Sequence, residues 1–142
     1  AAARGGVTCV QMREKECSTR EFIDQALTIK GFLKDHGIPL IINDRVDVAM
    51  AVEADGIHLG QTDMPLDMAK RIIGDSMIIG ISAESLNDAV RAQEQGANYI
   101  GVSPVFATDT SGGSPVAISA PAAMRVKAMD RTATTRSRQT AA

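Results

Sequence analysis

The stretch PLIINDRVDVAMAVEADGIHLGQTD, residues 39–63, contains the fold in miniature. It opens on a short apolar run that ends in Asn43 and Asp44, continues through a helical pattern over 46–52, and reaches a second apolar run, 56–59. Short apolar runs bounded by turn residues are typical of buried strands, and a helix between two such strands requires them to be parallel. The stretch therefore predicts a strand–helix–strand unit with polar residues after each strand.

The same unit recurs along the chain. Apolar runs begin near residues 7, 39, 56, 77 and 98, and helical patterns lie between them. Parallel strands with right-handed crossovers form a closed barrel or an open doubly wound sheet. Polar residues follow every strand here, which favours an α/β fold of the TIM (β/α)8 barrel type. A complete barrel usually needs about 200 residues or more, so this chain of 142 residues predicts a partial barrel of five strand–helix units.

Capping residues mark the predicted helix starts. Ser18 and Glu21 have the spacing of a capping box, in which each side chain binds the other residue's backbone N–H. Pro65 is expected as the first residue of a helix over 66–73, because proline is tolerated there. Ser85 with Asp88 predicts the start of the next helix.

The chain changes character after residue 113. Residues 115–129 are apolar and rich in alanine, and they predict a helix that ends a domain spanning 1–129. Residues 130–142 are polar and lack apolar periodicity, which predicts a disordered tail. A partial barrel leaves backbone unpaired at both sheet edges, so self-association is expected.

Composition excludes several classes of protein. The net charge of −2 and the interspersed charges give no basic surface for nucleic acid. No apolar stretch approaches the roughly 20 residues of a membrane span. Cys9 and Cys17 have neither metal-site spacing nor the number that a disulfide framework needs, which predicts two free thiols in a reducing cytoplasm. The expected partners are small phosphorylated molecules.

Gln11, Arg13 and Lys15 recur at every second position after the first predicted strand. An extended chain would direct all three side chains to the same side, giving one anion an amide donor and two cations. The alternative is a charged loop exposed to water. The spacing alone does not decide between the two.

Asn43, Asp44 and Asp63 follow neighbouring predicted strands. The two carboxylates suit a shared hard cation such as Mg²⁺, with phosphate oxygens and water completing its shell. The alternative is local: Asp44 would cap the helix that follows it, and Asp63 the helix that Pro65 opens.

Other polar residues carry weaker signals. His58 lies within a predicted strand and is expected to be an interior imidazole hydrogen-bonded to backbone rather than a catalytic group. Thr108, Thr110 and Ser111 occupy a loop rich in glycine and hydroxyl groups that suits phosphate, although spacing alone favours a flexible surface loop. Ser82 follows the fourth apolar run.

Taken together, these residues resemble the thiamine-phosphate synthase family, which includes a thiazole tautomerase branch. The resemblance covers about residues 4–111 and rests on five segments in order and at similar spacing. The segments are GGVTCVQMREKE (5–16), PLIINDRVDVA (39–49), ADGIHLGQTDMP (54–65), IIGIS (78–82) and GANYIGVSPVFATDT (96–110).

The resemblance implies a TIM barrel that joins hydroxymethylpyrimidine diphosphate to hydroxyethylthiazole phosphate, releases pyrophosphate and uses Mg²⁺. Arg13, Lys15 and Asn43 would be its catalytic residues. The implied binding residues are Gln11, Arg13, Lys15 and Asn43 for the diphosphate, Asp44 and Asp63 for Mg²⁺, Ser82 for the pyrimidine, and Thr108 and Thr110 for the thiazole phosphate.

The chain also departs from the family pattern. Ser111 stands where the family usually has lysine, and one lost charge-assisted contact costs about 1.5–3 kcal/mol. Glu84 stands where the tautomerase branch relies on histidine, which weakens that alternative. The family's first, seventh and eighth strands have no recognisable counterpart, so little or no turnover is expected from this chain alone. A tautomerase and a non-catalytic phosphate-binding relative stay open as alternatives.

Overall fold

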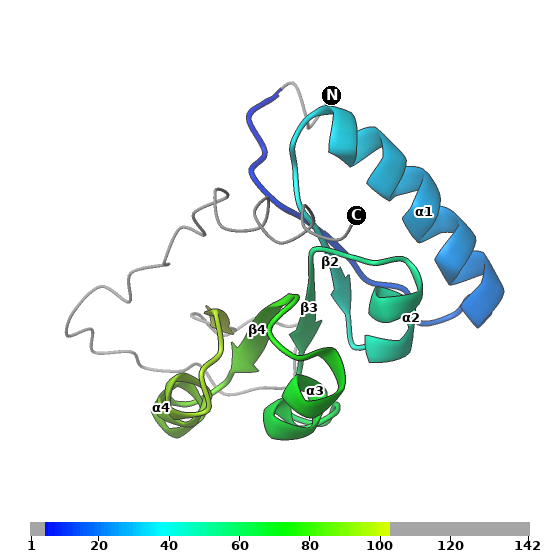
Figure 1. Ribbon diagram of the computed structural model, residues 1–142. Coiled ribbons are helices and arrows are strands. Elements are labelled where there is room, and N and C mark those ends of the chain that lie inside the picture. Colours follow the sequence, from blue (N-terminus) through cyan, green and yellow to red (C-terminus); the bar gives the residue numbers. More distant parts are fainter. Residues whose placement is uncertain (1–4, 103–142) are drawn as a thin grey trace, which may run out of the picture.

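The computed structural model describes residues 5–102, in which strands and helices alternate. The helices follow one another around the outside of a curved sheet (Figure 1). The elements are β1 (Val10–Met12), α1 (Thr19–Asp35), β2 (Leu40–Asn43), α2 (Val46–Ala51), β3 (Gly56–Leu59), α3 (Leu66–Ile73), β4 (Ile78–Ala83), α4 (Leu86–Glu94) and β5 (Tyr99–Val102).

The sheet has the strand order of a barrel wall. Its five strands pair in sequence order, and every pair is parallel. An open doubly wound sheet would reverse its strand order at one point, whereas no reversal occurs here. The predicted partial TIM-type barrel is therefore confirmed for residues 5–102.

The hydrophobic core lies between the sheet and the helices. Alternate strand residues point to this outer face, as the period of two requires. The buried outer-face residues include Leu40, Ile42, Ile57, Leu59, Ile79 and Ile81, and they pack against Phe22, Ala26, Leu33, Val48, Leu66, Ala69 and Ala92 of the helices.

The opposite side of the sheet, called here the inner face, is polar and rich in glycine. Its residues are Gln11, Ile41, Asn43, Gly56, His58, Ile78, Gly80, Ser82, Tyr99 and Gly101. The glycines make room for larger neighbours: a Cβ on Gly80 would lie 2.0 Å from the ring of Tyr99. The inner face is therefore built from a few large side chains packed over glycines.

Most predicted boundaries hold to within one residue, which places Asn43 inside β2, and two strands differ by more. The predicted strand over 7–12 forms only from Val10, because Pro39 on the partner strand has no N–H with which to extend the ladder. β4 continues past the predicted end at Ile81, since Ser82 and Ala83 pair with β5. Ser82 is thus a strand residue.

The helix caps follow the sequence prediction closely. Ser18 and Glu21 form the complete capping box of α1, and the Ser85 hydroxyl accepts a hydrogen bond from the Asp88 N–H at 3.1 Å. Pro65 differs by one position, because it is the N-cap of α3 rather than its first helical residue.

Polar side chains at the amino ends of the strands bind backbone. The Asp55 carboxylate accepts a hydrogen bond from the Leu40 N–H at 2.8 Å, and the Asn98 side-chain oxygen accepts one from the Ile79 N–H at 2.8 Å. Each contact joins a loop to the start of a neighbouring strand. These groups hold the sheet in register.

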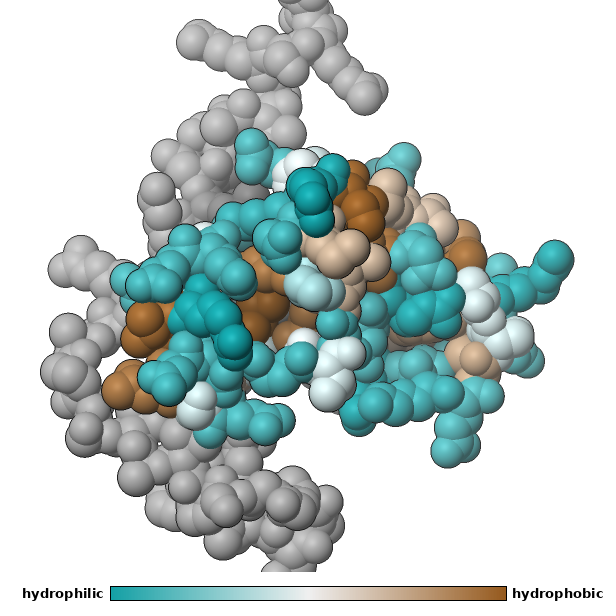
Figure 2. Space-filling view, turned by 90° about the horizontal axis from the view of Figure 1, so that it is seen from below, coloured by the Kyte–Doolittle hydropathy of each residue, from teal (hydrophilic) through white to brown (hydrophobic). Residues whose placement is uncertain are grey.

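The exposed surface is mixed. Hydrophilic residues cover most of the face seen in Figure 2, and apolar side chains form separate spots between them. None of the helices within residues 5–102 has the length and apolar character that crossing a membrane requires. Cys9 and Cys17 are both free thiols, as predicted.

Several predictions concern residues outside the described range. These are the phosphate-binding role of Thr108, Thr110 and Ser111, the helix over 115–129, the domain boundary at 129 and the disordered tail over 130–142.

Candidate functional site

Asp44 and Asp63 meet at the carboxyl ends of the strands. Burial above all raises the pKa of Asp44; a hydrogen bond from its protonated form to Asp63, and the repulsion between the two ionised groups, act in the same direction. Asp63 is fixed by the Gly60 N–H, which donates to its carboxylate at 2.6 Å. We call Asp44 and Asp63 the carboxylate pair.

The backbone around Asp44 places its side chain there. Asp44 has a φ of 66°, a left-handed conformation that aspartate and asparagine tolerate better than other non-glycine residues. Its N–H donates to the His58 carbonyl at 2.9 Å, and the Asn43 amide donates to its carboxylate. The chain therefore turns sharply at the end of β2.

The alternative of helix capping is wrong for both acids. The N-cap of α2 is Arg45, without a side-chain cap bond, and that of α3 is Pro65, also without one. Asp44 and Asp63 consequently keep oxygen atoms for each other and for a ligand.

Arg13 and Lys15 supply positive charge next to the pair. Both cations act to lower the pKa of Asp44, against the larger effects of burial and Asp63. β1 ends at Met12, so these residues follow the strand as irregular chain, and the predicted extended alternation does not continue through Lys15. Two cations and two carboxylates nevertheless come together at one rim.

Gln11 and Ser82 lie deeper, on the inner face. Gln11 hydrogen-bonds the Tyr99 hydroxyl, and the Ser82 hydroxyl lies 2.9 Å from Nε2 of His58. His58 is buried, and its Nδ1 lies 3.0 Å from the Tyr99 hydroxyl. The prediction that its ring binds backbone is wrong, because its partners are two side-chain hydroxyls.

Burial sets the protonation of this inner cluster. It lowers the pKa of His58, against a smaller opposing effect of Asp63, and it raises the pKa of Tyr99 to about 12. A neutral imidazole and a protonated phenol therefore occupy the inner face at neutral pH. Sequence reasoning missed Tyr99, although it is the single tyrosine of the chain and shares strand parity with Gly101.

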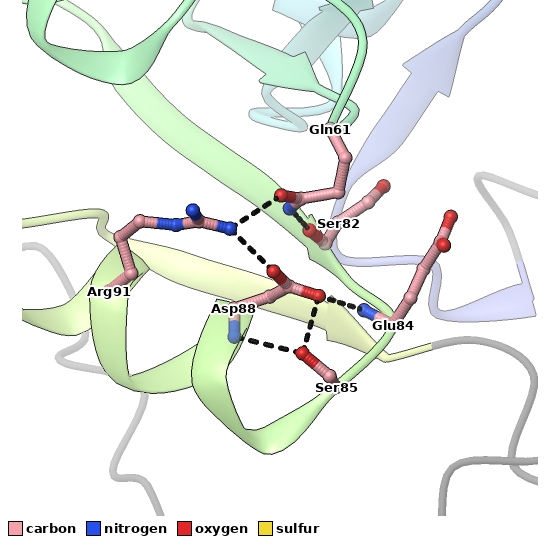
Figure 3. A network of polar contacts seen from close by, with 6 residues as sticks. All are labelled: Gln61, Ser82, Glu84, Ser85, Asp88 and Arg91. Carbon is pink, nitrogen blue, oxygen red and sulfur yellow. Dashed lines mark hydrogen bonds and ion pairs between the residues drawn. The ribbon is translucent and has the colours of Figure 1, made fainter.

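A second polar network fastens the loop that carries Asp63 (Figure 3). The Gln61 amide donates to the Ser82 carbonyl, and its oxygen accepts from Arg91 at 3.2 Å. Arg91 also donates to Asp88 at 2.5 Å, on the same helix, α4. Sequence reasoning missed Gln61 and Arg91, which lie 30 positions apart.

The donor set fits a hard divalent cation. Two carboxylates in contact repel each other, and a bound cation would remove that repulsion. Within residues 5–102, no cluster of three or more His, Cys, Asp or Glu side chains is placed to bind a metal. Asp44 and Asp63 would therefore hold Mg²⁺ together with ligand oxygens and water, the pattern typical of Mg²⁺ bound with phosphates.

These features define a class of protein. A parallel strand–helix wall with acids, cations and an amide at the carboxyl ends of its strands is typical of barrel proteins that bind phosphorylated ligands there.

The comparisons identify the family within that class. A family model described as Thiamine monophosphate synthase matches residues 1–130, and the chain belongs to this family. A thiamine-phosphate synthase of Albidiferax ferrireducens is 56% identical over 110 residues, covering 78% of this chain and 50% of the relative. That of Clostridium botulinum is 53% identical over 106 residues, covering 75% and 50%.

A solved structure agrees in fold. The thiamine phosphate pyrophosphorylase from Pyrococcus furiosus matches with a TM-score of 0.72 and 44% identity, over 76% of this chain and 53% of that one. The chain thus spans about half the length of the relatives it matches.

Proposed function

We propose that this chain carries the diphosphate and metal side of a thiamine-phosphate synthase active site. In this proposal the whole enzyme joins hydroxymethylpyrimidine diphosphate to hydroxyethylthiazole phosphate, releases pyrophosphate and acts in the cytoplasm. The observation that carries the proposal is the carboxylate pair with Arg13 and Lys15 beside it. The family membership and the relatives' names support it.

Each rim residue has a role in the proposal. Gln11, Arg13, Lys15 and Asn43 bind the diphosphate, and Asp44 and Asp63 hold Mg²⁺. Ser82 contacts the pyrimidine, and Thr108 with Thr110 binds the thiazole phosphate.

The proposed chemistry needs charge stabilisation rather than a nucleophile from the protein, because the thiazole nitrogen forms the new bond to the pyrimidine methylene carbon. When the bond between the pyrimidine methylene carbon and the diphosphate oxygen breaks, negative charge grows on the departing pyrophosphate. Arg13 and Lys15 are close enough to the carboxylate pair to act on the same diphosphate, and preorganised cations at developing charge are a large catalytic factor. Bound Mg²⁺ would supply further positive charge at the diphosphate oxygens.

The tautomerase alternative receives no support from the described residues. It requires a proton carrier at position 84, and Glu84 is exposed beyond the end of β4. Its backbone N–H donates to Asp88 at 3.3 Å, in the cap of α4.

Calorimetry tests the binding half of the proposal. We expect the chain to bind hydroxymethylpyrimidine diphosphate in Mg²⁺ and much more weakly in a chelator. Asp63→Asn should abolish the Mg²⁺ dependence, whereas Asp67→Asn, an exposed acid on α3, should leave it unchanged. Binding that depends neither on Mg²⁺ nor on Asp63 would contradict the proposal.

A chimera tests the catalytic half. Residues 5–102 would replace the matching region of the Albidiferax ferrireducens relative, and thiamine phosphate formation would be measured. We expect a functional chimera that loses activity with Arg13→Ala, and little or no turnover from the chain alone. An inactive chimera that folds and binds both substrates would overturn the catalytic assignment.

A further inference from the structure

His58 is held at both ring nitrogens by hydroxyl groups from other strands. Tyr99 of β5 lies 3.0 Å from Nδ1, and Ser82 of β4 lies 2.9 Å from Nε2. Gln11 of β1 hydrogen-bonds the same Tyr99 hydroxyl. We call Gln11, Tyr99, His58 and Ser82 the inner-face chain; it ends on two residues to which the proposed function gives substrate contacts.

The protons of the inner-face chain allow only two consistent arrangements. A neutral imidazole has one N–H, and each hydroxyl has one O–H. In the first arrangement hydrogen bonds run from Gln11 towards Ser82, so that Nε2–H donates to Ser82 and the Ser82 O–H is left over. In the second arrangement the hydrogen bonds run from Ser82 towards Gln11, so that the Ser82 O–H donates to Nε2 of His58.

The different chemistry of the two hydroxyls that meet His58 favours the first arrangement. A phenol O–H, with an ordinary pKa of about 10, is far more acidic than the aliphatic O–H of serine, so it is the stronger donor to an imidazole nitrogen. Tyr99 therefore donates to Nδ1 of His58, and its oxygen can accept from the Gln11 amide. The imidazole proton then lies on Nε2, facing Ser82.

Glycines on β4 and β5 make room for the two rings. A Cβ on Gly80 would lie 2.0 Å from the Tyr99 ring, and one on Gly101 would lie 3.1 Å from Cε1 of His58. The two ring centroids are 5.4 Å apart. A larger residue at Gly80 would displace the Tyr99 ring from this arrangement.

We propose that His58 and Tyr99 are positioning residues that oblige Ser82 to present its hydroxyl to the substrate as a hydrogen-bond donor. The group recognised at Ser82 is then an acceptor, such as a ring nitrogen of the pyrimidine. This inference rests on the proposed function. It goes beyond that function by assigning the direction of the hydrogen bond and the residues that set it.

The first test reads the tautomer directly. In ¹⁵N-labelled chain, long-range ¹H–¹⁵N correlation distinguishes the protonated from the unprotonated ring nitrogen of His58. We expect the proton on Nε2, and Tyr99→Phe to reduce that preference. A proton on Nδ1 in the unchanged chain would overturn the proposal whether or not a ligand binds.

The second test measures discrimination between two diphosphates in the presence of Mg²⁺. Benzyl diphosphate keeps the anionic group but lacks the ring nitrogens. We expect the unchanged chain to prefer hydroxymethylpyrimidine diphosphate by about tenfold, the size of one hydrogen bond. Ser82→Ala should remove the preference while both ligands still bind.

Two substitutions at His58 provide a matched pair. His58→Gln places an amide N–H near the position of Nε2 and should keep most of the preference, whereas His58→Asn lacks a donor there and should lose it. Equal loss in both variants, or equal affinity of the unchanged chain for both ligands, would overturn the positioning role alone. If neither diphosphate binds, the proposed function is wrong, and the role of Ser82 in substrate recognition falls with it.

Discussion

The rims at the amino and carboxyl ends of the strands carry similar polar residues with different roles. At the amino ends, Asp55 and Asn98 each accept a hydrogen bond from a backbone N–H of a neighbouring strand. At the carboxyl ends, Asp44 and Asp63 face each other, and the contact raises the pKa of Asp44. A polar side chain whose partner is backbone serves the fold, whereas two like-charged groups held together are available for a ligand.

The largest effect should come from removing the amino-end contacts. Asp55→Ala and Asn98→Ala each leave a strand N–H without its acceptor, a loss of about 1–3 kcal/mol in the free energy of unfolding. Urea denaturation would measure it. Asp24→Ala, an exposed acid on α1, is the control. An unchanged unfolding midpoint in both variants would show that these contacts do not hold the register.

Acid should destabilise the chain through His58. Burial lowers the pKa of His58 in the folded state, while the unfolded imidazole titrates at about 6.5. The unfolded state thus binds more protons, and stability falls as the pH drops below about 6.5, by at most about 1.4 kcal/mol per pH unit.

Denaturation at pH 7.5 and 5.5 measures this dependence, and His58→Gln should reduce it. Asp44 contributes with the opposite sign: its raised pKa makes the folded state bind the extra proton, so stability is lost as the pH rises through that pKa. An unchanged pH slope in His58→Gln would contradict the assignment of a neutral imidazole.

A smaller change in the free energy of unfolding, a gain rather than a loss, is expected at the carboxyl-end rim. Asp44→Asn removes the repulsion within the carboxylate pair and keeps a residue that tolerates the local backbone. We expect the metal-free chain to gain up to about 1 kcal/mol of stability. The gain should coincide with loss of stabilisation by Mg²⁺, measured as the shift in melting temperature. Destabilisation of the metal-free variant would place Asp44 with the structural residues of the other rim.

The smallest effect should follow from cutting the network that fastens the Asp63 loop. Arg91→Ala removes exposed contacts to Gln61 and Asp88, so the stability change should stay within about 0.5 kcal/mol. Mg²⁺ affinity, measured by calorimetry without substrate, should nevertheless fall by about threefold to tenfold, because Asp63 loses its support. Arg71→Ala on α3 is the control. Equal Mg²⁺ affinity in both variants would show that the loop keeps its position without Arg91.

The sequence predicted the structural features that depend on residues close together in the chain. The helix over 66–73 and the strand over 56–59 have the predicted limits, and the capping box of Ser18 forms as expected. These features depend on residues a few positions apart. Of the two choices left open at Asp44 and Asp63, the structure removes capping and brings the carboxylates together.

The features missed by sequence reasoning depend on distant partners. His58 and Tyr99 are 41 positions apart, and the hydrophobic periodicity of the sequence does not predict a contact between them. The same holds for Arg91, which the sequence shows only as a charge on a helix. Roles at the ligand itself, including those of Gln11, Asn43 and Ser82, stay predictions because they depend on molecules that the sequence does not contain.

The left-handed backbone at Asp44 restricts which amino acids can occupy that position. Glycine, asparagine and aspartate suit such a φ, and aspartate is the one acid among them. Glutamate can adopt a positive φ, as Glu53 does at 50°, but it tolerates this conformation less well than aspartate, so glutamate at position 44 would strain the turn after β2. We therefore expect related chains that keep this turn to have aspartate at this position, or else the uncharged residues asparagine or glycine.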